Sequence, residues 1–279
     1  MNQAVHGANE AKAAIDIACW DLAGKASGKR VCELLGGPRM DPVSTYHVIS
    51  IGTADESAAH ASKLQDDGLL KLQLKAGGRH IDEDIESIRA VSRVVRPGVD
   101  LFVDVNRGWT TTEAIQVSEA CADLRLSFEQ PCNTFEECAR AKPHLRHPLL
   151  LDESATDLAT IARAIVEGVA DGVGIKLTRI GGLTGMQAVR DLCAATRTPM
   201  SCDDSWGGDI IAAACVHLGS TLDPQISRGV WIADPYLGEH YDEVNGPRIV
   251  GGRIALPAGP GLGLEIPDGL FGAPVSVHC

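Results

Sequence analysis

The stretch LFVDVN at residues 101–106 ends a short apolar run with an acid, Asp104, and the chain repeats this pattern twice more. Glu129 follows the apolar run in LSFEQP, and Asp152 follows the one in PLLLDES, at intervals of 25 and 23 residues. Such an interval suits one strand, one helix and the loops that join them. We therefore predict a series of strand–helix units that places the three carboxylates at equivalent ends of parallel strands.

Two lysines extend this series at its two ends. Lys75 lies in KLQLKAGG (71–78), one unit earlier, and Lys176 lies in VGIKLTR (173–179), one unit later. Because side chains alternate along a strand, Lys71, Gln73 and Lys75 should share one face. Leu70, Leu72 and Leu74 should take the other face, toward the helices. Lys75 is then the residue nearest the end of its strand.

Short apolar strands alternate with amphipathic helices between residues 41 and 235, which predicts an α/β fold with parallel strands covered on both faces. We count eight such strands and predict a (β/α)₈ TIM-like barrel rather than an open sheet. The reason is that polar residues recur at the carboxyl ends of the strands, where barrel active sites lie. These residues are Asp104, Glu129, Asp152, Lys176 and Asp203.

The segments that flank the barrel have a different character. Residues 8–35 have the pattern of a helix, and we assign 1–40 to a helical linker. Residues 236–279 are rich in Gly and Pro but keep regularly placed Ile and Leu, so we predict strand and loop packed outside the barrel.

The amino-acid composition limits which kinds of molecule could be partners of this protein. The net charge of −12 argues against nucleic acid or an anionic membrane surface as a partner. No apolar run approaches the length of a membrane span, and the first residues lack a signal pattern. The nine cysteines show no CxxC spacing, which favours reduced thiols and a cytoplasmic location.

The three acids suit a magnesium site, because hard divalent cations prefer oxygen ligands, whereas zinc would favour His or Cys. Each acid alone would more readily be a helix cap or a surface charge, but three acids at equivalent strand ends favour the metal site. A lysine beside such a site can act as a base if burial and the metal lower its pKa, although Lys75 could also form a structural ion pair. Lys176 should lie across the barrel mouth, so that two amines address the two faces of one carbon. This arrangement suits removal of a proton α to a carboxylate through an enediolate.

At these residues the chain resembles the enolase superfamily, in its mandelate racemase and muconate-lactonizing branch. The resemblance covers almost the whole chain, and the motifs follow the family order. They are AAIDIACWDLAGKASGKRVCELLGG, LQLKAGG, VDVNRGW, FEQPC, LDES, GIKLTRIGGLTG and PAGPGLGLEI.

The resemblance implies Mg²⁺ bound by Asp104, Glu129 and Asp152, with Lys75 and Lys176 as acid/base catalysts. It implies that Asn106, on the same strand face as Asp104, supports the metal site, and that Glu153 points elsewhere, toward a lysine. Gln73 replaces a lysine of the family pattern, which removes one positive charge near the substrate. The family's N-terminal capping domain is expected to be missing from this chain, and the family habit implies a homo-oligomer.

The motif SCDDSWGGD (201–209) resembles that of dehydratases and epimerases acting on proline derivatives. Asp203 or Asp204 could pair with a substrate nitrogen, and the ring of Trp206 could attract the same cation. Alternatively, Trp206 packs in the barrel rim and the two acids cap the next helix.

Three functions remain open at this point. The first is a lyase reaction of amino acid catabolism, the dehydration of cis-3-hydroxy-L-proline. The second is epimerisation or racemisation of a proline derivative or betaine, an isomerase reaction that shares the first proton abstraction. The third is a truncated barrel without activity. Muconate-type cycloisomerisation and dipeptide epimerisation are more distant alternatives.

Overall fold

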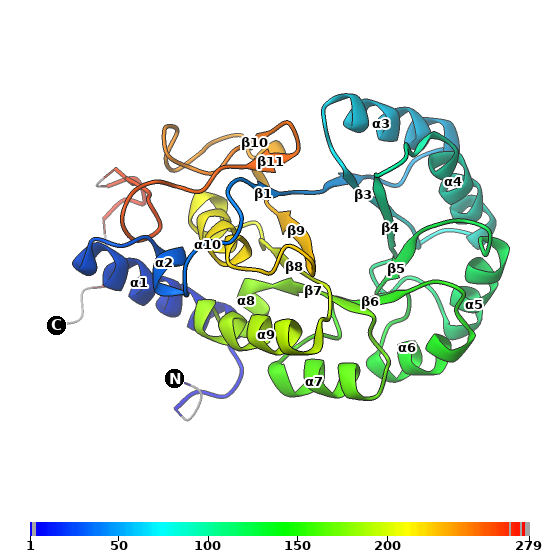
Figure 1. The fold of residues 1–279 in the computed structure, drawn as a ribbon, viewed down its shortest axis with the longest axis horizontal. Coiled ribbons are helices and arrows are strands. Elements are labelled where there is room, and N and C mark those ends of the chain that lie inside the picture. The colour runs from blue at the N-terminus through cyan, green and yellow to red at the C-terminus, as the bar shows by residue number, and fades with distance from the viewer. Residues whose placement is uncertain (2–3, 268, 274, 277–279) are drawn as a thin grey trace.

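The computed structural model describes residues 1, 4–267, 269–273 and 275–276, and it contains eight parallel strands arranged as a nearly closed barrel (Figure 1). The strands pair in chain order, each parallel to the next, which confirms the predicted (β/α)₈ fold. Their bounds are β2 (His47–Ile49), β3 (Lys71–Lys75), β4 (Asp100–Asp104), β5 (Ser127–Glu129), β6 (Leu149–Leu151), β7 (Gly172–Lys176), β8 (Met200–Asp203) and β9 (Ser227–Trp231).

Helices cover the outside of the barrel. Their bounds are α3 (Ala54–Asp66), α4 (Ile81–Val94), α5 (Thr111–Ala120), α6 (Phe135–Ala141), α7 (Leu158–Val166), α8 (Leu177–Ile180), α9 (Leu183–Thr196) and α10 (Gly208–Ser220). Three of them begin with the same capping box, in which a Thr hydroxyl and a Glu carboxylate three residues later satisfy each other's backbone N–H groups. The N-terminal cap of α5 is Thr110.

The strand β3 shows how alternating side chains divide between the barrel interior and the apolar layer under the helices. Leu72 and Leu74 are fully buried in the core between strands and helices. Lys71, Gln73 and Lys75 point the other way, as their alternation predicts. Leu70 precedes the strand and is 58% exposed, so the prediction that it packs toward the helices was wrong.

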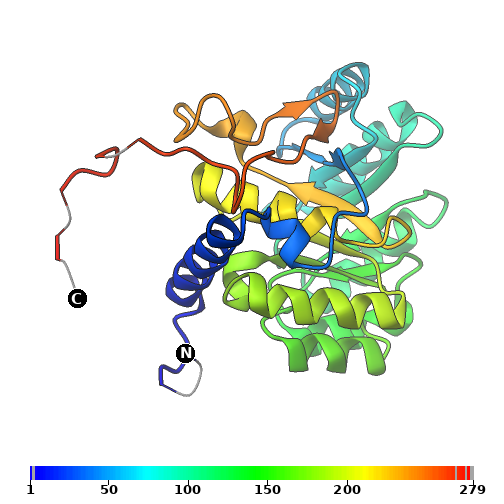
Figure 2. The same cartoon turned by 60° about the vertical axis from the view of Figure 1, so that its left-hand side comes forward.

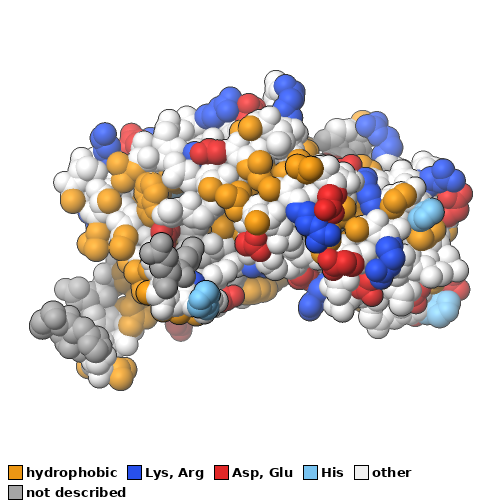
Figure 3. Space-filling model, turned by 90° about the horizontal axis from the view of Figure 1, so that it is seen from below, with side chains coloured by type: hydrophobic (Ala, Val, Ile, Leu, Met, Phe, Trp, Pro, Cys, Tyr) orange, Lys and Arg blue, Asp and Glu red, His pale blue; other side chains and the backbone are white. Residues whose placement is uncertain are grey.

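The outer surface of the helices carries charges of both signs. Figure 3 shows acidic and basic side chains interspersed on the face seen from below. Arg163 of α7 illustrates the pattern, since it pairs with Glu136 of α6 and with Glu167. No helix in the described part of the chain is long and apolar enough to cross a membrane.

The segments before and after the barrel lie together at one side of it (Figure 2). The predicted helix over 8–35 is two helices, α1 (Asn9–Ser27) and α2 (Val31–Leu34), because Gly28 ends the first with a φ of 67°. The segment 43–51 is likewise divided between two strands, β1 (Val43–Ser44) and β2. Its first part, β1, pairs antiparallel with β11 (Arg253–Ile254) in a small sheet completed by β10 (Ile249–Val250).

The C-terminal segment packs outside the barrel, as predicted, with Ile254, Leu256, Leu262 and Leu264 buried. The predicted range 236–279 includes residues 268, 274 and 277–279, which lie outside the described residues. The described residues also form two short 3₁₀ helices, η1 (Lys142–His144) and η2 (Asp234–Tyr236).

Helix α1 is joined to the C-terminal segment by backbone contact at Gly261. The N–H of Val31 donates to the carbonyl oxygen of Gly261, and the N–H of Gly261 donates to that of Lys29, both at 2.9 Å. A Cβ on Gly24 would lie 2.6 Å from the Cα of Gly261. Glycine at position 24 is therefore required for this close approach.

We predict that Gly24→Ala lowers the free energy of unfolding by about 1–3 kcal/mol, because the new methyl group pushes apart two packed backbones. Urea denaturation measures this loss. Gly238→Ala is the matched control, since a Cβ at Gly238 meets no atom within 4 Å. Equal stability of the two variants would contradict the account of this contact.

Candidate active site

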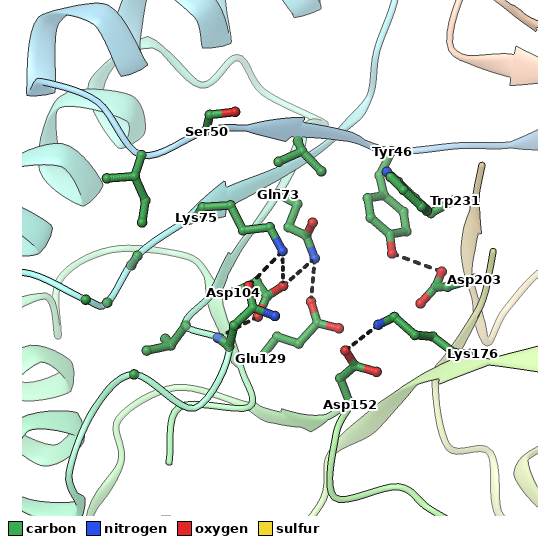
Figure 4. Close-up of a pocket in the computed structure, with 18 of the residues that line it drawn as sticks. Tyr46, Ser50, Gln73, Lys75, Asp104, Glu129, Asp152, Lys176, Asp203 and Trp231 are labelled. Atoms are coloured by element: carbon green, nitrogen blue, oxygen red, sulfur yellow. Dashed lines mark hydrogen bonds and ion pairs between the residues drawn. The ribbon is translucent and has the colours of Figure 1, made fainter. Parts of the chain in front are cut away.

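A cavity of about 780 Å³ lies at the carboxyl ends of the barrel strands and contains most of the residues predicted from the sequence (Figure 4). The predicted residues that line it are Gln73, Lys75, Asp104, Asn106, Glu129, Asp152, Lys176, Asp203 and Trp206. The cavity has the size of an ordinary small-molecule site.

The register of the sheet explains why these side chains meet. Lys75 is paired with Asp104, and Asp104 with Glu129, so that three neighbouring strands present them at one level. On the other side of the barrel, Lys176 is paired with Asp203. Strands β3 and β7 are four positions apart in the eight-stranded sheet, which places Lys75 and Lys176 on opposite sides of the cavity, as predicted.

The acids of the cavity are almost fully buried. Asp104, Glu129, Asp152 and Asp203 are each between 2% and 3% exposed. Burial, followed by the charges of the other three acids, raises the pKa of Glu129 well above its ordinary value. The cavity therefore favours any cation that can approach Glu129.

Lys75 is held against Asp104. Its Nζ donates to Oδ2 of Asp104 at 2.5 Å and to Oδ1 of Asn106 at 2.9 Å. The prediction that Asn106 lies on the same strand face as Asp104 was wrong. Asn106 has a φ of 45° and lies in the turn that follows β4. Asp104 stabilises this turn by accepting the N–H of Asn106 at 2.9 Å, and Asn tolerates the left-handed conformation well.

Glu153 turns away from the cavity, as predicted, but its partners are not lysines. It accepts a hydrogen bond from Nδ2 of Asn106 at 3.2 Å and lies 3.7 Å from Nε of Arg107. Glu153 therefore holds the amide that contacts Lys75.

Lys176 and Arg179 both bind Asp152. Nζ of Lys176 donates to Oδ2 at 2.7 Å, and Nη1 of Arg179 donates to Oδ1 at 2.6 Å. Although burial opposes its ionisation, these two cations lower the pKa of Asp152. Burial likewise opposes the charge on Lys176, but Asp152 and Asp203 outweigh it and raise the pKa of Lys176. Sequence reasoning missed Arg179, because the short helix α8 that carries it was not predicted.

Gln73 bridges two of the acids. Its Nε2 donates to Oδ2 of Asp104 at 3.1 Å and to Oε2 of Glu129 at 2.8 Å. The other oxygen of Glu129 lies over Gly174, where a Cβ would be only 2.5 Å away. Glycine at position 174 thus leaves the space that the Glu129 carboxylate occupies.

The donor set fits a magnesium ion in its chemistry, because Asp104, Glu129 and Asp152 offer only carboxylate oxygens in a buried, acidic cavity. In the present arrangement the nitrogen atoms of Gln73 and Lys75 contact these carboxylates. Among the described residues, no group of three or more His, Cys, Asp or Glu side chains is arranged so that it could hold a metal ion. The metal-binding role of the three acids stays a prediction.

Asp203 belongs to the far side of the cavity. It accepts hydrogen bonds from the hydroxyl of Tyr46 at 2.9 Å and from that of Ser201 at 2.8 Å. Burial is the main reason that the pKa of Asp203 rises to about 6. Asp204 faces the other way and accepts the backbone N–H groups of Gly207 and Ala233, so it does not line the cavity.

Three aromatic side chains line the cavity on the side of Asp203. The ring of Trp206 lies 5.4 Å from that of Trp231 and 5.5 Å from that of Tyr236, in tilted and edge-on contacts. Trp206 is 60% exposed at the rim. Sequence reasoning missed Tyr46, Trp231 and Tyr236. The first two could have been found from their places in the sequence, because Trp231 is paired with Asp203 and Tyr46 directly precedes the first barrel strand, β2.

The loop after Lys75 is fastened by a buried cluster on Asp84. Its carboxylate accepts the N–H of Gly77 at 2.9 Å, Nε of Arg79 at 2.7 Å and Nε1 of Trp109 at 2.9 Å. Arg79 in turn donates to the carbonyl oxygen of Gly52 at 2.7 Å. One acid therefore ties together two loops at the cavity rim.

Comparison with known proteins gives two family matches. Residues 56–269 match the enolase C-terminal domain-like family, and residues 1–36 match the N-terminal domain of the mandelate racemase / muconate lactonizing enzyme family.

Two characterised relatives are similar along most of the chain. The cis-3-hydroxy-L-proline dehydratase of Roseibium aggregatum is 37% identical over 276 residues, which is 99% of this chain and 75% of the relative. The N-succinyl-L-Arg/Lys racemase of Bacillus cereus is 30% identical, over 95% of this chain and 72% of the relative.

Solved structures agree with these matches. A mandelate racemase/muconate lactonizing enzyme structure from Silicibacter pomeroyi is 33% identical and superposes with a TM-score of 0.94, covering 99% of this chain and 76% of the other. An enolase superfamily member from Roseovarius nubinhibens, complexed with magnesium, is 31% identical with a TM-score of 0.93, over 99% and 75% of the two chains.

We predict that Asp84→Ala destabilises the protein by about 3–5 kcal/mol, because Arg79 and Trp109 lose a buried charged partner. Thermal and urea unfolding measure the loss, and limited proteolysis should cut first near residues 76–80. Glu86→Ala on the exposed face of the same helix is the control. If both variants are equally stable, the cluster does not hold the loops.

Proposed function

Because the chain belongs to the enolase superfamily, in the mandelate racemase / muconate lactonizing enzyme family, we propose that it removes the α proton of a small carboxylate substrate and dehydrates cis-3-hydroxy-L-proline. The observation that carries this proposal is the pair Lys75 and Lys176, which face each other across a cavity of buried carboxylates. The similarity to a cis-3-hydroxy-L-proline dehydratase supports the substrate.

The reaction needs one proton to leave and one to arrive. A lysine amine takes the α proton, the electron pair of that bond forms a double bond to the β carbon, and the carbon–oxygen bond breaks. A general acid gives a proton to the departing hydroxyl, which leaves as water, and the remaining enamine tautomerises to a cyclic imine. Positioned acid and base groups of this kind contribute about 10²–10⁴-fold to a rate.

Asp104, Glu129 and Asp152 are the residues that would hold Mg²⁺. When bound, the ion supplies positive charge for the negative charge that develops on the substrate carboxylate. Gln73 and Lys75 contact two of these acids, so their side chains would have to share the carboxylates with the ion or move from them.

The substrate nitrogen fits the far side of the cavity. The buried carboxylate of Asp203 could accept a hydrogen bond from a protonated secondary amine, and the aromatic rings of Trp231 and Tyr46, which line the same cavity, could attract the cation. Trp206 would cover this region from the exposed rim.

Epimerisation of a proline derivative or betaine is the second candidate. It is favoured by the placement of two amines on opposite sides of the cavity, since one could remove a proton and the other return one to the opposite face. Related racemases and epimerases support this alternative.

Incubation with Mg²⁺ and cis-3-hydroxy-L-proline in D₂O, monitored by NMR and mass spectrometry, distinguishes these two reactions. We predict loss of the hydroxyl group and formation of a cyclic imine. Epimerisation would instead retain the hydroxyl group and give α-deuterium with inversion. EDTA should stop the reaction and added Mg²⁺ should restore it. Absence of any exchange across a panel of proline derivatives would overturn the proposed function and favour an inactive barrel.

In the same assay, Lys75→Met tests the assignment of the base. Exchange should fall by at least about 10²-fold, because the other lysine that lines the cavity, Lys176, lies on its opposite side. Lys29→Met, at an exposed lysine far from the cavity, is the control. Unchanged exchange in Lys75→Met would rule out this lysine as the base.

We predict that Asp203→Asn raises KM for the amine substrate by about tenfold or more, with a smaller effect on kcat, because a charge-assisted hydrogen bond to the nitrogen is lost. With a pKa of about 6, Asp203 becomes protonated as the pH falls below that value, so substrate affinity should weaken there. Asp204→Asn makes the same change at the next residue, outside the cavity. A similar KM in both variants would exclude Asp203 from the nitrogen subsite.

A further inference from the structure

A second cavity, of about 1020 Å³, lies at the opposite end of the barrel, where the amino ends of the strands meet. Its walls are the turns that lead into β4, β5 and β6, together with Arg228 at the start of β9. A cluster of Tyr46, Phe102 and Leu150 fills the barrel interior between this cavity and the candidate active site. The second cavity therefore has no share in the proton-transfer chemistry proposed above.

Arg228 is a charged group with an unused hydrogen-bond donor. Its side chain is only 17% exposed, and its guanidinium carbon lies 4.9 Å from the ring centroid of Phe102. Among the described residues its Nη2 atom is buried without a hydrogen-bond partner. The carboxylate of Asp100 stands 3.6 Å from that atom, beyond hydrogen-bond distance, and is half exposed. An unsatisfied donor on a buried charge is costly, so this site favours an additional acceptor.

A second cation lies next to Arg228. Nζ of Lys71 donates to the carbonyl oxygen of Ser227 at 3.0 Å and to Oγ of Ser44 at 3.4 Å, which are both neutral acceptors. Burial, followed by the positive charge of Arg228, lowers the pKa of Lys71 to about 8, while Asp100 acts in the opposite direction. Two partly buried cations thus lie near one half-exposed carboxylate.

We propose that the cavity at the amino ends of the strands binds a small oxyanion, such as a phosphate or carboxylate group, on the guanidinium of Arg228. A guanidinium presents parallel N–H groups that match two oxygens of such an anion. The anion supplies the acceptor that Nη2 lacks and a negative charge for Lys71. Asp100 competes with the anion for the same guanidinium.

Inorganic phosphate and acetate serve as the probes, each added to the full chain in place of sodium chloride at constant ionic strength. We expect a saturable rise in Tm and saturable heat in titration calorimetry, with the tighter of the two probes identifying the favoured anion. Arg228→Met, which keeps an apolar side chain against Phe102, should weaken binding by at least about tenfold. Arg96→Met is the control, because Arg96 lines the same cavity but pairs with Asp66.

Asp100→Asn tests the proposal in the opposite direction, since removal of the competing carboxylate should tighten binding. Because Asp100 is exposed, the Asp100→Asn variant can test the proposal even if Arg228→Met does not fold. A rise in Tm that does not saturate would indicate the general stabilising effect of the salt. That result, equal binding by Arg228→Met, or unchanged affinity in Asp100→Asn would overturn the proposal.

Discussion

The carboxylates of Asp104, Glu129, Asp152 and Asp203 are held together out of water, and their mutual repulsion is the constraint on which the cavity depends. Ionised carboxylates in such surroundings are stable only when cations or hydrogen-bond donors compensate them. Lys75, Lys176 and Arg179 supply three positive charges, and Gln73 supplies an amide. The amines of Lys75 and Lys176 are also the groups that the proposed reaction uses. Charge balance and proton transfer therefore depend on the same contacts.

The barrel meets this constraint through register. Strands β3, β4 and β5 end in polar side chains at one level, and so do β7 and β8, as the pairs Lys75 with Asp104 and Lys176 with Asp203 show. Repeated Thr-x-x-Glu capping boxes begin three of the helices that follow these strands. A shift of one residue in any strand would turn its functional side chain into the apolar layer between strands and helices.

Much of this arrangement could be predicted from the sequence, because strand alternation and even spacing are local signals. The barrel, its strand order and the facing positions of Lys75 and Lys176 follow from them. Local signals did not predict what depends on turns and on distant contacts. Asn106 reaches Lys75 from a left-handed turn rather than from the strand, and Arg179 comes from a helix of four residues. Asp203 and Asp204 look equivalent in sequence, yet only Asp203 faces the cavity, because neighbouring backbone N–H groups bind Asp204. The division of residues 43–51 between two sheets depends on β11, about 200 residues later.

Helix α1 contacts residues that lie far away in the sequence, so these contacts can form only late in translation. Asp16 of α1 binds Thr184, 168 residues away, and Asp21 binds the N–H of Leu262, 241 residues away. At a translation rate of roughly 5–20 residues per second, α1 waits about 10–50 s on the ribosome before its last partner is made. During that time the face that later packs against Gly261 and α9 is exposed to other nascent chains. Helix α1 therefore stays without the partners that bury this face until almost the whole barrel has been translated.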